Sequence, residues 1–504
     1  MKRALISVTN KLHLDYLVPK LESMNYIIYS TGGTYKYLNK IIKNNDNIIP
    51  LARYTESQEI LGGRVKTLHP KIFAGLLAKK KDKKHFRDML FTNSEFFDTL
   101  VVNLYPFEET IKNTDNEEEI IEQIDIGGHS LLRAGIKNYK HISVLSCPSQ
   151  YKDFIEGNKD NLQLAKEGIK NIMDYDIAIN NWFNKDNISV SYNKVDDLKY
   201  GLNPYMKPSS IYIKKDNIAP YNIINGNPGY INFLDANNAI KLVIEVKETL
   251  GLSCCASFKH NSPAGVSLFD RSSRITFLNT RNIDPKSSFG DFIGYSGHVD
   301  VDMANEIKKY VSDGIIASYY DNESIEILKN KKKNNYIIMK QSYILKEEQE
   351  FRDVNGVTLV QPYNDCILTP EELDDNNDKF NDDIKRDMIL GFITLKYTQS
   401  NSVCFVYQGK VIGIGAGQQN RVDCVRLAGN KAKEWLERNN IKDAELILVS
   451  DAFFPFSDNI DVANEYNVKY IAQPGGSVRD AEVEDRCNEY GIKMYYTGKR
   501  VFTH

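Results

Sequence analysis

The sequence predicts an α/β fold, with a parallel, doubly wound sheet in its first half, on three observations. Short apolar segments of strand length occur at residues 4–8, 26–29, 99–104 and 142–145. A segment with helical spacing of its apolar residues, 12–24, lies between the first two. The run Ser30-Thr31-Gly32-Gly33-Thr34 then leads from a strand into another helix. Short strands that alternate with helices indicate a parallel sheet with helices on both faces.

The second half also predicts an α/β fold, although strands and helices alternate less regularly there. Residues 403–407 and 411–414, joined through Gln408-Gly409-Lys410, are expected to form a hairpin. Residues 421–439 have the length of a long helix. Further strands are expected at 252–256, 446–449 and 468–471.

Length and composition indicate more than one domain. A chain of 504 residues is too long for one ordinary core, and a polar stretch at 184–197 marks the expected connection between a domain of residues 1–190 and a domain of residues 191–504. A net charge of −3 gives no general attraction to nucleic acid or membranes. The lysine runs at 79–84 and 331–333 lack interleaved aromatic residues, so we expect them to be solvated. No apolar run approaches the ~20 residues of a membrane span.

The cysteine and histidine patterns argue against disulfides and metals. Seven cysteines are scattered without CxxC spacing, which predicts reduced thiols, a cytoplasmic location and no zinc site. The eight histidines are also unclustered, so we expect no catalytic metal.

Two segments of the first domain suit the phosphate of a nucleoside monophosphate. The glycines and hydroxyls at 30–34 would bring backbone N–H groups and a helix N-terminus to an anion. In the segment 62–70, Arg64 and Lys66 are one residue apart, so an extended backbone would point both cations the same way. No GxGxxG run supports a dinucleotide site.

Three further residues of this domain are candidates for chemistry. Tyr105 follows a strand, Asp125 precedes a glycine pair, and Lys137 lies on the next helix. Tyr105 and Lys137 also have a purely structural interpretation, because tyrosines at strand ends and helical lysines are common without function.

The most informative run in the second domain is 257–265, which contains Lys259 and His260. We expect the preceding strand to stop at a turn formed by Ser262-Pro263-Ala264-Gly265, so that the lysine and histidine lie at a strand end, where ligand groups gather in open α/β sheets. Histidine can move a proton near neutral pH, and lysine can stabilise developing negative charge. For this pair alone, two solvated side chains are the plainer interpretation.

Four further stretches of the second domain place amides, hydroxyls or carboxylates beside tight turns. They are 288–292, 397–402, 413–421 and 450–456. The phenylalanines of the last stretch suit either core packing or an apolar wall for a flat heterocycle.

These motifs are similar to those of a known family. The segments 62–70 (GGRVKTLHP) and 396–403 (KYTQSNSV) are highly specific to it, and matches run from Ser7-Val8-Thr9 to Arg500-Val501-Phe502-Thr503-His504. The chain resembles the bifunctional AICAR transformylase/IMP cyclohydrolase family of purine biosynthesis. Its Ser-Phe-Lys-His and Ser-Phe-Gly-Asp-Phe runs look like the eukaryotic-type branch.

The resemblance implies a fold and two reactions. The N-terminal domain would be a methylglyoxal-synthase-like cyclohydrolase, and the C-terminal domain a transformylase of two cytidine-deaminase-like subdomains without zinc. The transformylase would move a formyl group from 10-formyltetrahydrofolate, a co-substrate, to the 5-amino group of AICAR, and the cyclohydrolase would close the product FAICAR to IMP. No tightly bound cofactor is implied, and the family's transformylase sites form across a homodimer interface.

The resemblance also assigns residues to each site. For ring closure, the catalytic residues implied are Lys66, Tyr105, Asp125 and Lys137, and the nucleotide-binding residues are Ser7, Thr9, Lys11, Ser30, Thr31, Gly32, Gly33, Thr34, Arg64, Thr67, Gly127 and Gly128. For formyl transfer, the catalytic residues implied are Lys259, His260, Asn401 and Asp291, and the binding residues are Lys199, Tyr200, Asn232, Arg421, Phe453, Pro455 and Arg500.

Several positions depart from the family pattern. Lys199 replaces an arginine, Tyr205-Met206 replaces His-Gln, and His129 stands where proline follows the glycine pair. A lysine offers a point charge instead of the planar fork of arginine. Two alternatives therefore stay open: a chain that retains one of the two activities, and a purine-nucleotide-binding protein without catalysis. Nucleic-acid binding is a third.

Overall fold

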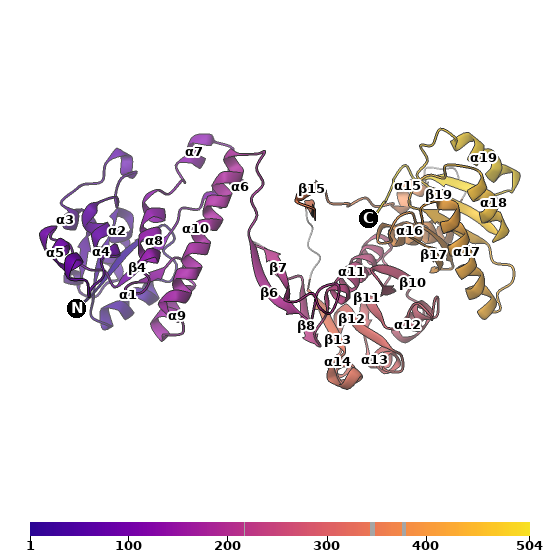
Figure 1. Cartoon of the computed structure of the whole chain (residues 1–504), viewed down its shortest axis with the longest axis horizontal. Coiled ribbons are helices and arrows are strands. Elements are labelled where there is room, and N and C mark those ends of the chain that lie inside the picture. The colour runs from indigo at the N-terminus through magenta and orange to yellow at the C-terminus, as the bar shows by residue number, and fades with distance from the viewer. Residues whose placement is uncertain (216, 343–347, 375–379) are drawn as a thin grey trace. The chain divides into compact units, whose positions relative to one another are not determined.

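The computed structural model describes residues 1–215, 217–342, 348–374 and 380–504. The chain divides into two compact units (Figure 1). Unit 1 comprises residues 1–193 with 214–216, and unit 2 comprises residues 194–213 with 217–504.

Unit 1 is built on one sheet in which all five strands are parallel, in the order β3-β2-β1-β4-β5. The strands are β1 (Lys2–Val8), β2 (Tyr26–Ser30), β3 (Ile48–Pro50), β4 (Thr99–Asn103) and β5 (Ser143–Leu145). Because alternate residues of a strand face opposite ways, Ala4 and Ile6 of β1 belong to one core, and Leu5 belongs to the other. The sheet therefore has a buried core on each face, which confirms the doubly wound fold.

The helices of unit 1 cover these two faces. Apolar side chains of α1 (Leu14–Ser23), α2 (Gly32–Ile41) and α9 (Gln150–Glu156) lie over one face, and α3 (Leu51–Thr55), α4 (Pro70–Leu77) and α8 (Gly127–Lys137) cover the other. The remaining helices are α5 (Lys83–Phe91), α6 (Phe107–Asn113), α7 (Glu117–Ile121) and α10 (Asn161–Phe183). A capping box begins α10, because the Asp160 carboxylate accepts from the Gln163 N–H while the Gln163 side chain accepts from the Asp160 N–H, both at 2.8 Å.

Unit 2 contains a mixed sheet of eleven strands, in the order β20-β19-β18-β16-β17-β10-β9-β11-β12-β13-β8. Its strands are β8 (Tyr221–Asn225), β9 (Cys254–Lys259), β10 (Ser262–Leu268), β11 (Asp291–Val299), β12 (Ser312–Tyr320), β13 (Ile337–Gln341), β16 (Val403–Tyr407), β17 (Lys410–Gly415), β18 (Leu446–Ser450), β19 (Val468–Gln473) and β20 (Lys493–Tyr496). Two smaller ribbons pair β6 (Tyr192–Leu198) with β7 (Ser209–Lys214) and β14 (Gln349–Val354) with β15 (Val357–Pro362).

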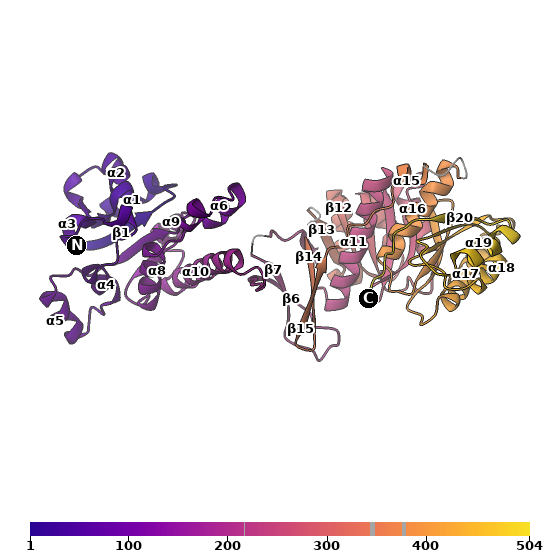
Figure 2. The ribbon, with the colours of Figure 1, turned by 90° about the horizontal axis from the view of Figure 1, so that it is seen from above.

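Helices also cover both faces of this sheet. On one face α11 (Tyr230–Leu250) and α16 (Asp382–Lys396) pack together over a shared core, as Figure 2 shows. On the other face α12 (Ser273–Arg281), α13 (Val301–Ile307) and α14 (Asn322–Lys329) cover one half of the sheet, and α17 (Arg421–Arg438), α18 (Asp458–Glu465) and α19 (Asp480–Glu489) cover the other half. A short helix, α15 (Pro370–Asp374), precedes α16.

Unit 2 repeats one topology twice. In each half a helix leads into an antiparallel hairpin, and three helix–strand pairs follow whose strands are parallel to one another. The first half begins with α11 and β9–β10, and the second with α16 and β16–β17. Antiparallel pairing of β10 with β17 joins the halves into one sheet.

The structure differs from the sequence prediction at 262–265. These residues begin β10 instead of forming a turn, and the register shifts between Pro263 and Gly265. Lys259 pairs with Ser262, so the turn consists of His260 and Asn261 alone. The proline is tolerated because the irregularity relaxes the ladder next to it.

The structure bears on three expectations from the composition: the state of the cysteines, membrane-spanning segments and the lysine runs. All seven cysteines are free thiols. No helix among the described residues is long and apolar enough to cross a membrane. The expectation of a solvated lysine run is wrong for Lys331, which is 8% exposed, because its ammonium donates to the Tyr310 carbonyl and lies 5.0 Å from the Tyr336 ring centre.

Candidate active sites

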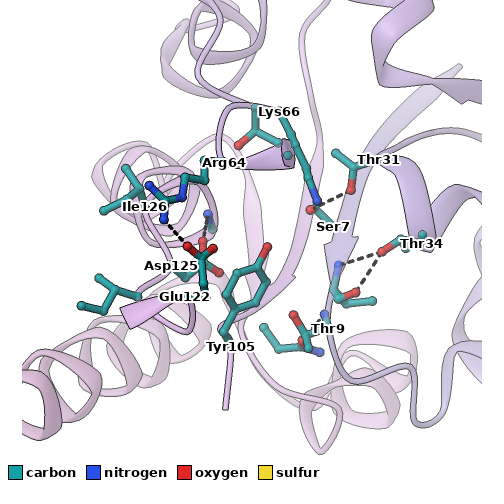
Figure 3. A pocket seen from close by; sticks show the side chains of 18 of the residues that line it. Ser7, Thr9, Thr31, Thr34, Arg64, Lys66, Tyr105, Glu122, Asp125 and Ile126 are labelled. Atoms are coloured by element: carbon teal, nitrogen blue, oxygen red, sulfur yellow. Dashed lines mark hydrogen bonds and ion pairs between the residues drawn. The ribbon is translucent and has the colours of Figure 1, made fainter. Parts of the chain in front are cut away.

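A pocket of about 540 Å³ opens at one edge of the unit 1 sheet (Figure 3). The strands β1, β2 and β4 are parallel, so the residues at or just past their carboxyl ends meet at this edge. Helix N-termini and two loops complete the wall. The predicted residues that line the pocket are Ser7, Thr9, Lys11, Thr31, Gly33, Thr34, Arg64, Lys66, Thr67, Tyr105, Asp125, Gly127 and Gly128.

Hydroxyl groups and backbone N–H groups form one side of this pocket. The Ser7 hydroxyl lies 3.0 Å from that of Thr31, which precedes the first turn of α2. The Thr34 hydroxyl donates to the Val8 carbonyl at 2.9 Å. The Thr34 hydroxyl hydrogen is thereby engaged, whereas the Ser7–Thr31 hydroxyl pair beside the N-terminus of α2 suits a phosphate group.

Ser30 does not line the pocket. It is the last residue of β2, it is fully buried, and its hydroxyl donates to the Ile6 carbonyl at 2.8 Å. Gly32 is also not among the lining residues, and a Cβ atom there would approach the Glu59 carboxylate to 2.8 Å.

The loop with the two cations is a tight turn, not the extended segment that the sequence predicted. Arg64 has helical backbone angles (φ −66°, ψ −25°), and Ile60 pairs with Val65 across the turn. Gly63 has a φ of 93°, and a Cβ atom there would come within 2.7 Å of the Lys66 side chain. The turn still brings Arg64 and Lys66 into the pocket.

Each cation has a carboxylate partner that the sequence analysis missed. Arg64 forms an ion pair with Glu122, and Lys66 lies 3.9 Å from Glu59. Glu59 stands five residues before Arg64 and Glu122 stands three before Asp125, so proximity to the motifs was the only signal for either residue.

Asp125 is the buried carboxylate of the pocket. Its Oδ1 atom accepts from the Gly128 N–H at 2.7 Å. A Cβ atom at Gly128 would lie 2.4 Å from the carboxylate, and one at Gly127 would lie 2.6 Å from the Thr67 hydroxyl, so a larger residue at either position would displace a side chain of the pocket. Burial raises the pKa of Asp125, although the bond from Gly128 opposes that shift.

Tyr105 faces the same space as Lys66 (Figure 3). Burial raises the pKa of its phenol, and the negative charges of Asp125, Glu59 and Glu122 raise it further. Tyr105 is therefore a neutral hydroxyl at physiological pH. The pocket thus combines a buried carboxylate, a neutral phenol and a lysine.

Lys137 does not line this pocket. It ends α8, whose first residue is Gly127, so it lies about 15 Å along the helix from the pocket. It borders a separate groove with His129, Arg133 and Ile169.

The predicted residues of unit 2 come from both halves of its sheet but reach one edge. The β9–β10 turn carries His260 there, and β11 starts at that edge with Asp291. Because β10 is antiparallel to β17, and β16 is antiparallel to β17 and β18, the same edge carries the start of β16, the end of β17 and the end of β18. Asn401, Arg421 and Asp451 flank those strand ends.

The Lys259 ammonium contacts a neighbouring loop. It donates to the Gly290 carbonyl at 2.6 Å and to the Phe289 carbonyl at 3.1 Å. Gly290 has a φ of 74°, and a Cβ atom there would lie 3.0 Å from the ammonium. His260 is exposed beside it.

Asp291 is buried instead of facing the open edge. It is 1% exposed, its Oδ1 atom accepts from the Arg281 guanidinium at 2.8 Å, and its Oδ2 atom accepts from the Ser257 hydroxyl at 2.6 Å. Burial raises the pKa of Asp291, and Arg281 and Ser257 oppose the shift. Both carboxylate oxygens are engaged within the protein.

Arg421 is also held inside the protein. It is 6% exposed, pairs with the fully buried Asp451, and donates to the Asn401 side-chain oxygen at 2.9 Å. The Asn401 amide in turn donates to the Gln418 carbonyl at 3.0 Å. Arg421 and Asp451 therefore orient Asn401, and the sequence signal for Asp451 was its place at a strand end.

The remaining predicted residues differ in exposure. Asn232 accepts from the Gly229 N–H at 3.1 Å and donates to Asp313 at 3.2 Å, so its amide caps α11. The Lys199 ammonium lies 5.7 Å from the Tyr200 ring centre. The last three predicted residues are exposed or partly exposed: Phe453, Pro455 and Arg500.

No group of three or more histidine, cysteine, aspartate or glutamate side chains in the described parts of the chain is placed to hold a metal ion. The side chains gathered at the two sites offer proton transfer and charge stabilisation.

Comparison with known proteins gives two family matches. The AICARFT/IMPCHase bienzyme family matches residues 135–431, and the MGS-like domain matches residues 14–130. Curated proteins named bifunctional purine biosynthesis protein PurH, from Prochlorococcus marinus strains MIT 9312 and MIT 9301, are each 37% identical over 526 aligned residues, which cover 99% of both chains. The crystal structure of ForH aligns with 38% of this chain and all of its own, at 24% identity and a TM-score of 0.33.

Proposed function

The chain belongs to the AICARFT/IMPCHase bienzyme family, and from that membership we propose how its residues divide the family's two reactions. The enzyme catalyses the last two steps of IMP biosynthesis, formyl transfer to AICAR and dehydrative closure of FAICAR to IMP. One observation carries the assignment of residues: Lys66, Tyr105 and Asp125 line one pocket with a set of phosphate donors. We assign ring closure to residues 1–190 and formyl transfer to residues 191–504.

Ring closure needs charge placement and no cofactor. The carboxamide nitrogen attacks the formyl carbon and its proton passes to a base. The former formyl oxygen then leaves as water, with that proton and the proton of the formamide nitrogen, as the carbon–nitrogen double bond forms. We assign the base to Asp125, because burial raises the pKa of this carboxyl and makes it a better proton acceptor. Lys66 stabilises the oxygen that becomes negative, and the neutral phenol of Tyr105 donates to it. The folded substrate conformation brings the two reacting atoms together.

Formyl transfer uses 10-formyltetrahydrofolate as co-substrate in this proposal. The AICAR amine attacks the formyl carbon and its proton passes to His260. The carbon–nitrogen bond to the folate then breaks, and the folate nitrogen takes up a proton, so that tetrahydrofolate is released. Lys259 stabilises the oxyanion, and Asn401 orients the reacting groups. Asp291 acts from a buried position through Ser257, which precedes Lys259 by two residues on β9.

We propose that the enzyme is a cytoplasmic homodimer whose formyl-transfer site is completed by the second subunit. The free thiols support the location. The spacing of the sheet supports the dimer: β9 and β16 are separated by two strands, so Lys259 and Asn401 lie about 14 Å apart along the edge.

The division of labour is tested by two substitutions. Lys66→Ala should abolish ring closure and leave formyl transfer near the parent rate, so that FAICAR accumulates. His260→Ala should lower kcat for formyl transfer by about 10²–10⁴-fold, the usual contribution of a general base, while closure of supplied FAICAR continues. Equal loss of both activities in either variant would contradict the assignment.

The shared site is tested by complementation. We mix the inactive His260→Ala and Asn401→Ala proteins, allow subunits to exchange, and measure formyl transfer. If each site takes His260 from one subunit and Asn401 from the other, mixed dimers contain one intact site and activity returns. Sedimentation measures the dimer in parallel. No recovery in a confirmed mixed dimer would place both residues of a site in one subunit.

A further inference from the structure

The turn that carries His260 has an unfavourable backbone. His260 has a φ of 52° and Asn261 a φ of 61°, the angles of a two-residue type I′ hairpin turn. Asn and Gly are the usual residues there, and any residue other than glycine in the left-handed region carries a backbone cost that surrounding contacts must offset. The ladder pairs Lys259 with Ser262 and leaves the Asn261 N–H outside it.

A buried aspartate satisfies that N–H group. Asp235 lies on α11, is 4% exposed, and its Oδ1 atom accepts from the Asn261 N–H at 2.6 Å. One helical turn further along α11, the Asn238 amide donates to the Asn261 side-chain oxygen at 2.8 Å. Hydrogen bonds to ionised acceptors are stronger than neutral ones, so Asp235 is the main attachment of the turn to the helix.

The second half of the sheet contains the same arrangement without a candidate active-site residue. Gln408 and Gly409 form the β16–β17 turn with φ angles of 45° and 70°. Asp387 on α16 is 3% exposed and accepts from the Gly409 N–H at 3.0 and 3.1 Å. Asp235 and Asp387 are each the sixth residue of their helix. Because β17 is antiparallel to β10, the start of β17 and this turn lie at the edge of the sheet opposite to the His260 turn.

We propose that Asp235 is a positioning residue for formyl transfer, which fixes the backbone of the Lys259–His260–Asn261 turn and so the direction of the His260 imidazole. The proposal rests on the formyl-transfer function assigned above. The repeat separates two roles of the carboxylate. Both Asp235 and Asp387 stabilise a hairpin turn, but only Asp235 also positions a proton acceptor. Loss of the hydrogen bond from the turn should lower the stability of the protein at both positions. Misplacement of the His260 imidazole should lower formyl transfer, and only a substitution of Asp235 should cause it.

The test compares Asp235→Ala with the matched control Asp387→Ala in the full-length enzyme. We measure kcat and KM for formyl transfer, ring closure of supplied FAICAR as the reaction of the other unit, and the temperature and amplitude of thermal unfolding, which report how much of unit 2 is folded. Both variants should unfold at a lower temperature. Asp235→Ala should lower kcat for formyl transfer by about 10²-fold, the cost of misplacing a catalytic group, with KM for AICAR little changed. Asp387→Ala should keep the parent kcat. Equal losses of kcat in the two variants would overturn the proposal.

Two further variants keep the test decisive. Asp235→Asn retains a carbonyl oxygen that can accept from the Asn261 N–H, so it should recover most of the lost kcat; failure to do so in a folded protein would contradict the positioning role. In the double variant Asp235→Ala/His260→Ala, the Asp235 substitution should cost nothing further, because both act through one imidazole. Additive losses would show that Asp235 acts elsewhere.

The single variants distinguish a failure of the assigned function from a failure of this inference. If the His260→Ala enzyme retains formyl transfer, the assigned function itself is wrong. If only the Asp235→Ala enzyme retains it, the function stands and this inference fails.

Discussion

At the scale of single residues, Asp125 is held where its charge is unfavourable to folding. Burial raises the pKa of this carboxyl in the folded state above its ordinary value. The protonated form is therefore favoured by folding, and this stabilisation is present at pH below the ordinary pKa and lost as the pH rises through the raised value. At neutral pH, the ionised Asp125 lowers the free energy of unfolding.

Replacing Asp125 should lower the rate of ring closure and raise the stability of the fold. In Asp125→Asn the amide oxygen can still accept from the Gly128 N–H, but no charge has to be buried, so the unfolding temperature at pH 7 should rise. Ring closure should fall by about 10²–10⁴-fold with the loss of the base. The parent enzyme should lose ring closure as the pH falls through the raised pKa of Asp125. An Asp125→Asn protein that closes the ring at the parent rate would contradict the role of this residue.

The motif residues that line a site differ from the other polar motif residues in the partners of their side-chain polar atoms. Lys66, Tyr105 and Asp125 follow from motifs, because their chemistry needs those residue types next to glycine turns. Ser30 and Arg421 belong to motifs as well, yet their polar atoms bond to the protein itself. The sequence shows that a residue is polar, and only the fold shows which partner satisfies it.

At the scale of elements, the two hairpins of unit 2 show what turn signals can and cannot predict. The β16–β17 hairpin follows from Gly409, which takes a positive φ without strain. The β9–β10 turn lacks glycine, whereas Pro263 and Gly265 next to it resemble a turn signal. Asp235 stabilises this turn from a helix 26 residues away in sequence. A long-range contact therefore overrides the local propensity on which the prediction relied.

The β16–β17 turn can be improved. Gln408 is an exposed residue with a φ of 45°, a conformation that Asn adopts more readily than Gln. Gln408→Asn should therefore raise the free energy of unfolding by up to about 1 kcal/mol, the lower end of the strain at such positions. Denaturant unfolding measures the change, and both activities should equal those of the parent. A lower stability would mean that Gln408 makes a contact that compensates for its backbone strain.

At the scale of the whole molecule, only the family resemblance implied a repeat within unit 2, as two subdomains of one kind; the alternation of strands and helices in the sequence did not show it. The two halves share the order of helices and strands but place different residues at equivalent points: His260 and Asn261 in one turn match Gln408 and Gly409 in the other. The halves share a buried aspartate that stabilises each hairpin, Asp235 in one half and Asp387 in the other. Neither residue was a candidate from the sequence. Alternation of strands and helices predicts a fold class, whereas a repeat of topology needs the pairing of strands.

The two units have separate cores, and this predicts how the enzyme unfolds. Among the described residues, three hydrophobic clusters lie wholly within residues 4–182 and three wholly within residues 221–501. Cooperative unfolding follows shared buried surface, so each unit should melt as its own transition in calorimetry. Asp125→Asn should raise only the unit 1 transition, and Asp387→Ala should lower only the unit 2 transition. Each substitution thereby identifies the unit that gives rise to a transition. After the enzyme is heated to a temperature between the two transitions, it should have lost one of the two activities, ring closure or formyl transfer, and kept the other. A single transition that both variants shift would show that the units unfold as one cooperative structure.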